Sequence, residues 1–171
     1  MEAPKTRPRI KIRRTTPDWV IEFLAFAFLI ILIALPLIFA NDLPERIPTH
    51  FNFAGEPDDY GTKMTLWLLP VIGTIMYLGM TIVESFPYIY NYPVEITQEN
   101  AVNQYRLATR LIRILKTIIL IIFSFISYGT IKTALGNTTG LGKAFLPVFL
   151  LLTFSVIIIF IAKSLNNRHT G

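Results

Sequence analysis

Residues 43–63 read LPERIPTHFNFAGEPDDYGTK, a polar segment that separates two strongly apolar runs. Its prolines, Pro44, Pro48 and Pro57, fix φ and remove backbone donors. Its glycines, Gly55 and Gly61, permit positive φ. This density of turn-forming residues predicts a shaped loop, with at most a short strand around residues 47–53.

The runs on either side of this loop are two of four apolar blocks that are each long enough to cross a bilayer. The blocks are Trp19–Ala40, Met64–Val83, Leu111–Leu135 and Ala144–Ala162. The chain has 171 residues, of which 53% are hydrophobic, too many for a soluble domain of this length. It has no cysteine, which excludes disulfides, thiol catalysis and cysteine-based zinc sites.

These blocks predict an all-α integral membrane protein with four transmembrane helices and an extracytoplasmic Pro/Gly-rich loop between the first two helices. Residues 1–18 form a basic tail, expected to be disordered up to the membrane, and residues 19–84 hold two spans around loop 43–63. Residues 85–110 form an aromatic turn and an amphipathic helix. Residues 111–163 hold the last two helices, and residues 164–171 form a tail.

The basic residues predict the orientation. Twelve Lys and Arg fall in the two terminal segments and the second connection, whereas four fall in the first and third connections. Because positive loops stay in the cytoplasm, both termini are expected to be cytoplasmic and loop 43–63 to face outward. Membrane orientation therefore explains the net charge of +5 better than nucleic-acid binding does. The expected location is the bacterial cytoplasmic (inner) membrane, with the lipid bilayer as the first partner.

The second connection carries a basic stripe. Thr97 is a candidate cap for a helix that runs on into the third span, and Arg106, Arg110 and Arg113 share one of its faces. This cytoplasmic face is expected to anchor the helix to lipid, with docking of a partner as the alternative.

Two carboxylates lie near the ends of apolar blocks. Glu22 is a functional candidate because charges in a membrane are costly, although it can also snorkel to water or meet Arg13 or Arg14. Glu84 is expected at the cytoplasmic interface.

Within the loop, alternation along an extended segment places Phe51 and Phe53 on one face and His50 and Asn52 on the other. Pro57 and Asp58 favour a turn closed near Gly61. The returning Lys63 is expected to pair with Asp58 or Asp59.

His50 and the neighbouring loop acids also raise the question of a metal site. Oxygens from Asn52, Glu56, Asp58 and Asp59 could hold a hard cation, whereas a zinc site would need further histidines. The alternative is that His50 and Asn52 satisfy loop backbone groups and the acids are solvated. We expect neither a metal nor a cofactor.

The loop resembles the signature of a bacterial membrane family, the domain of unknown function 1648. The shared positions include Leu43 and Ile47 together with the candidate recognition residues Pro44, Pro48, His50, Phe51, Asn52, Gly55, Pro57, Asp58, Gly61 and Lys63. This domain also occurs in SdpI-type immunity proteins, which protect cells against a secreted killing peptide. The resemblance thus implies a membrane location and an architecture of two helices around a shaped loop.

Three functions remain open. The first is a non-enzymatic sensor or immunity protein whose outward loop binds a peptide or another membrane protein. The second is an accessory subunit of a membrane complex. The third is a metal-dependent membrane enzyme or transporter that uses His50 and Asp58.

Overall fold

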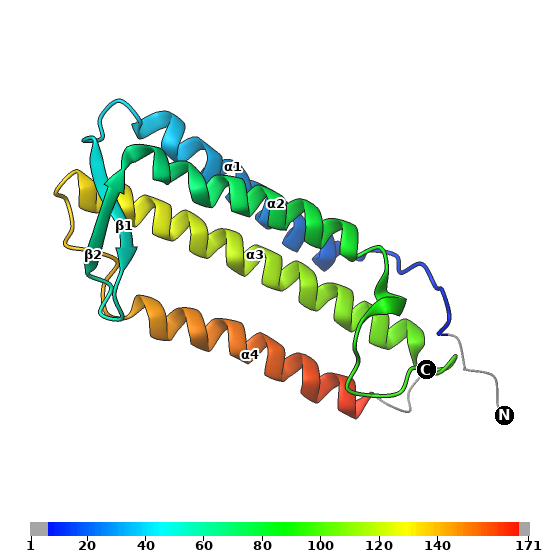
Figure 1. Cartoon of the computed structure of the whole chain (residues 1–171). Helices are drawn as coiled ribbons and strands as arrows, with labels where there is room; N and C mark the ends of the chain where they lie inside the picture. Colours follow the sequence, from blue (N-terminus) through cyan, green and yellow to red (C-terminus); the bar gives the residue numbers. More distant parts are fainter. Residues whose placement is uncertain (1–6, 168–171) are drawn as a thin grey trace.

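The computed structural model describes residues 7–167, which form four long helices and a two-stranded hairpin (Figure 1). The helices are α1 (Thr16–Phe39), α2 (Leu68–Val83), α3 (Ala101–Ala134) and α4 (Phe145–Asn166). The short 3-10 helices η1 (Lys63–Trp67) and η2 (Pro87–Ile89) precede and follow α2. Helices α1, α3, α4 and the continuous η1–α2 unit are each long and apolar enough to cross a membrane, as predicted.

Helix α1 begins where its sequence provides a capping box. The Thr15 backbone N–H donates to Asp18 Oδ2 over 2.8 Å, and Pro17 lies in the first turn, where a missing N–H costs no helical hydrogen bond. Pro36 lies inside the last turn, and the Ala40 N–H still donates to its carbonyl over 3.0 Å. The helix therefore continues to Phe39 despite this proline.

Helix α3 is the centre of the bundle, with α1 and α2 on one side and α4 on the other (Figure 1). Ala25, Leu29 and Leu32 of α1 pack against Leu120 of α3. Lipid tails are as apolar as these side chains, so helices in a bilayer associate through close fit. Gly73 shows such a fit, because a Cβ there would lie 2.7 Å from Leu32 Cδ2.

The loop between α1 and α2 is an antiparallel hairpin of β1 (Arg46–Phe51) and β2 (Pro57–Thr62), which corrects the expected loop with at most one short strand. The turn lies at residues 52–56, not near Gly61. Asn52 Oδ1 accepts from the Ala54 and Glu56 N–H groups over 2.9 and 3.1 Å, and Gly55 has φ 75°. Pro57 starts β2, where its missing N–H is tolerated.

The prediction that Phe51 and Phe53 share one face of a strand is wrong. Phe53 leaves the strand, lies in the turn and is 89% exposed, whereas Ile47 at the start of β1 is fully buried. Ile47 packs with Leu35, Leu43, Leu66 and Ile131, so it joins the hairpin to the helices. The pairing register also shifts on both sides of His50, which breaks the simple two-residue alternation.

The segment before α1 is ordered over residues 7–15, contrary to the expected disorder up to the membrane; residues 1–6 lie outside the described chain. The segment is extended, and Ile10 and Ile12 pack against Tyr105 and Ile96. The Tyr105 hydroxyl donates to the Pro8 carbonyl over 3.0 Å. Apolar residues at alternate positions thus fasten a basic segment to the start of α3.

The amphipathic helix and the third span form one helix, as predicted, but the residue at its N-cap is Asn100 instead of Thr97, and the helix begins at Ala101. Thr97 and Asn100 form two reciprocal hydrogen bonds across the turn that precedes the helix. The Thr97 N–H donates to Asn100 Oδ1 over 2.9 Å, and the Asn100 N–H donates to Thr97 Oγ1 over 3.3 Å.

Candidate functional site

A pocket of about 340 Å³ lies beneath the hairpin, between β1, the start of α2 and the facing ends of α3 and α4. Pro48, His50 and Phe51 line it from β1, and Leu66 and Leu69 line the α2 side. Most of its wall is apolar. The fold thus brings three residues of the predicted recognition loop to the edge of a cavity.

Besides the buried Thr130, Ser127 of α3 brings a polar side chain to this pocket. The residue is fully buried, and its hydroxyl has no hydrogen-bond partner among the described residues. Nearby helical hydroxyls behave differently, since Ser124 Oγ donates to the Leu120 carbonyl and Thr133 Oγ1 to the Gly129 carbonyl, each over 2.8 Å. An unpartnered buried hydroxyl is costly, and this one belongs to a residue of the pocket wall.

The exposed face of the hairpin holds charge pairs rather than a cluster. His50 Nδ1 lies 2.6 Å from Asp58 Oδ1, and Thr49 Oγ1 donates to Asp59 Oδ2 over 3.2 Å. Lys63 pairs with Glu45 over 2.9 Å, not with Asp58 or Asp59 as predicted. Across residues 7–167, no group of three or more His, Cys, Asp or Glu side chains is placed to hold a metal ion.

The hairpin tip docks on the glycine-rich connection between α3 and α4. The Leu141 N–H donates to the Gly55 carbonyl over 2.7 Å. A Cβ on Gly55 would lie 2.6 Å from the Gly142 carbonyl oxygen, so the contact requires glycine. Because Leu141 also lines the pocket, this contact joins the hairpin tip to the pocket wall.

The remaining motif residues shape the hairpin. Pro44 precedes β1, Gly61 belongs to β2, and Lys63 begins η1. A Cβ on Gly61 would lie 2.8 Å from Thr49 Cγ2, so the cross-strand contact favours glycine there too.

The opposite end of the bundle holds a buried ionic cluster that the sequence did not predict. Its acids are Asp18, Glu22 and Glu84, and its bases are Arg14, Arg110, Arg113 and Lys116. Lys116 is 1% exposed, and its Nζ lies 3.0 Å from carboxylate oxygens of both Glu22 and Glu84. The cluster thus ties α1, the end of α2 and α3 together.

Two of the three basic-face arginines belong to this cluster. Arg110 Nε donates to Asp18 over 2.9 Å, and Arg113 bridges Asp18 and Glu84 at 3.2 and 2.8 Å. They are therefore held within the bundle, which corrects the expected open lipid-facing or docking surface for these two. Arg106 Nε is buried without a hydrogen-bond partner among the described residues.

The spacing of charged residues in the sequence already indicates part of this cluster. Arg110, Arg113 and Lys116 recur every three residues, and Asp18 and Glu22 are four apart, so each set shares a helix face. In the sequence, Lys116 is one of the basic residues of the second connection that predict the orientation. Glu22 does meet Arg14, as one alternative held, but at 3.9 Å, and Lys116 is its closer partner.

Comparison with known proteins places the hairpin in a recognised domain. The model of the domain of unknown function DUF1648 matches residues 27–74. An uncharacterized protein of Archaeoglobus fulgidus is 36% identical over 66 residues, which cover 34% of this chain and 36% of that protein. This chain therefore spans about a third of the length of that relative. No solved structure matches this chain. The resemblance inferred from the loop is thus confirmed: the second half of α1, the hairpin and the start of α2 carry the DUF1648 domain.

Proposed function

We propose that this multi-pass membrane protein is a non-enzymatic recognition protein whose hairpin pocket binds an apolar segment of a peptide or of another membrane protein. The pocket beneath β1 supports this proposal, because an apolar cavity with one or two polar groups is the usual form of a ligand site. The unpartnered Ser127 hydroxyl is the observation that carries it. A backbone carbonyl of a bound peptide would satisfy that donor.

The proposed orientation places the hairpin outside the cell and both termini in the cytoplasm. The hairpin and the α3–α4 connection lie at one end of the bundle, and the segment before α1 and the end of α4 lie at the other (Figure 1). Most basic side chains belong to the second end, as the positive-inside rule requires of a cytoplasmic end. The bacterial origin of the membrane stays a prediction, since the similar protein is archaeal.

Toxin-peptide immunity is the form of recognition that we propose to test first. The accessory-subunit alternative is weaker because Arg110 and Arg113 are already paired inside the bundle. A metal-dependent enzyme or transporter would have to work with His50 and Asp58 alone on an exposed surface.

The test uses a strain without this gene, challenged with purified secreted peptides. We expect at least one apolar peptide to inhibit the deletion strain more strongly than the parent. Wild-type protein and Ser127→Ala, which leaves the pocket open, should restore growth at least in part, whereas Ser127→Phe, which fills it, should not.

Membrane levels of each variant are measured by blotting, so that lost protein is not mistaken for lost binding. A control variant, Thr153→Phe, enlarges a side chain on α4 away from the hairpin pocket and should restore growth. Full protection by Ser127→Phe, or equal sensitivity of parent and deletion strain to every peptide, would contradict the proposal.

A further inference from the structure

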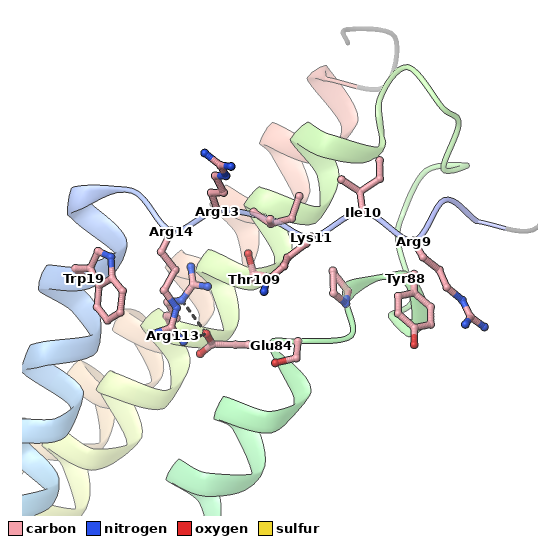
Figure 2. Close-up of a pocket in the computed structure, with 13 residues that line it drawn as sticks. Arg9, Ile10, Lys11, Arg13, Arg14, Trp19, Glu84, Tyr88, Thr109 and Arg113 are labelled. Carbon is pink, nitrogen blue, oxygen red and sulfur yellow. Dashed lines mark hydrogen bonds and ion pairs between the residues drawn. The ribbon is translucent and has the colours of Figure 1, made fainter.

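A second cavity lies at the opposite end from the hairpin, has a volume of about 750 Å³ and is open to the surroundings. Residues 9–14 form one wall, the start of α1 and the segment that follows α2 (residues 84–88) form another, and α3 closes the back (Figure 2). None of the hairpin residues lines it, so it is separate from the pocket discussed above.

Basic side chains dominate this cavity. Arg9, Lys11, Arg13, Arg14 and Arg113 line it, against one acid, Glu84. Figure 2 shows Arg14 and Arg113 meeting at Glu84, with Arg9 and Arg13 extending away at the rim. The cavity therefore carries a large excess of positive charge.

The charge of Glu84 is already compensated. Its carboxylate lies 3.2 Å from Arg14, 2.8 Å from Arg113 and 3.0 Å from Lys116. Lys11 and Arg13 are exposed, and neither forms an ion pair or hydrogen bond with another residue in the range 7–167. Two cations thus remain available at the opening for an anion from outside the protein.

The cavity also has an apolar side, formed by Ile10, Ile12, Pro87 and the exposed indole of Trp19. Trp19 lies in the first turn of α1, where a spanning helix reaches the membrane surface, and indole rings are enriched at that depth. A ligand that combines an anion with an apolar body, positioned at the bilayer surface, matches both sides of the cavity.

We propose that this cavity binds the phosphate headgroup of an anionic membrane lipid, with Lys11 and Arg13 as the cations that contact the phosphate. Alternation along the extended segment supports this assignment. Ile10 and Ile12 fasten the segment to Tyr105 and Ile96, and the exposed side chains of Lys11 and Arg13 alternate with them. Both cations can therefore turn toward a headgroup at the opening without breaking an ion pair or hydrogen bond to another residue in the range 7–167.

The test is a titration of the full-length protein in an uncharged detergent, with Trp67→Phe so that Trp19 is the remaining tryptophan. Its fluorescence is followed during addition of short-chain phosphatidylglycerol, of short-chain phosphatidylcholine and of inorganic phosphate. We expect a saturable change with phosphatidylglycerol alone.

Lys11→Gln/Arg13→Gln in the same background should weaken binding about thirty-fold, which corresponds to about 1 kcal/mol for each removed cation. Lys132→Gln/Lys143→Gln is the matched control, because it removes two cations from the hairpin end and should bind like the parent. Thermal unfolding of both double variants checks that the fold is intact. Each single variant, Lys11→Gln and Arg13→Gln, should fall between the parent and the double.

Three results would overturn the proposal. Equal binding of phosphatidylcholine would show that the anion is not recognised, and equal binding of inorganic phosphate would show a site for soluble anions instead of lipid. Unchanged affinity in the Lys11→Gln/Arg13→Gln protein would show that the charge excess of this cavity is not what binds.

Discussion

Removal of the Lys116 ammonium group should destabilise the bundle more than removal of any exposed cation. In the folded protein its Nζ donates to Glu22, to Glu84 and, over 2.8 Å, to Thr81 Oγ1. The consequence of Lys116→Met therefore depends on what each carboxylate retains.

The two acids are affected unequally. Glu84 keeps Arg14 at 3.2 Å and Arg113 at 2.8 Å. Glu22 keeps the Tyr77 hydroxyl at 2.9 Å, but its remaining cation, Arg14, is 3.9 Å away. A buried charge that loses its partner typically costs about 3–5 kcal/mol. Since one carboxylate of the two is left poorly paired, we expect a loss near the lower end, about 3 kcal/mol.

The assay is reversible unfolding in mixed micelles with rising dodecyl sulfate, followed by circular dichroism. Lys63→Met is the control, because its partner Glu45 has a side chain that is 85% exposed and such pairs contribute less than about 1 kcal/mol. Lys116→Met combined with Glu22→Gln should recover most of the loss, because the stranded charge is then absent. A loss no larger than that of the control, or no recovery in the double variant, would refute this account of the cluster.

Three further predictions concern other parts of the chain. Gly55→Ala should loosen the hairpin tip and lower the stability of the folded protein by about 1–3 kcal/mol, because φ is 75° and the new Cβ would meet the neighbouring turn. Gly79→Ala is the control and should cost little stability, since nothing lies within 4 Å of a Cβ there. Hydrogen exchange of the hairpin amides measures the difference. A cysteine at the exposed position Thr49 should react with an impermeant thiol reagent in intact cells, and one at Arg13 only after lysis; the reverse pattern would overturn the proposed orientation. Burial, and then the Glu84 carboxylate, raise the pKa of Tyr90 to about 12. The contribution of the protonated Tyr90 to stability is therefore complete below pH ~10, the pKa of tyrosine in the unfolded chain, and is lost as the pH rises through about 12. Tyr90→Phe should flatten this part of the curve of stability against pH.

Hydropathy was sufficient to locate the helices, because spanning length and apolar composition are local properties of the chain. The four predicted blocks agree with α1, η1–α2, the later part of α3 and α4. The position and identity of the loop domain also followed from the sequence, since the motif of Pro48, His50 and Gly55 lies within one short segment and residues 27–74 match DUF1648.

The hairpin differs from the predicted loop because its turn forms at other residues than those that local turn chemistry favours. Pro57 and Asp58 are favourable in a turn, but Asn52 closes one earlier with its own side chain, and Gly55 supplies the positive φ. The contact between Gly55 and the α3–α4 connection then holds the turn at these residues. A local sequence pattern cannot predict this contact, because the two segments are far apart in the sequence.

By itself, then, the sequence determined the four helices of spanning length, the connections between them, and the DUF1648 domain around the first connection. Tertiary structure alone decided which charges meet: Lys116 lies 94 positions from Glu22 in sequence and 3.0 Å from it in space. Electrostatic pairing depends on distance in space, and the helix packing that sets this distance turned a predicted basic surface into the ionic cluster that holds three helices together.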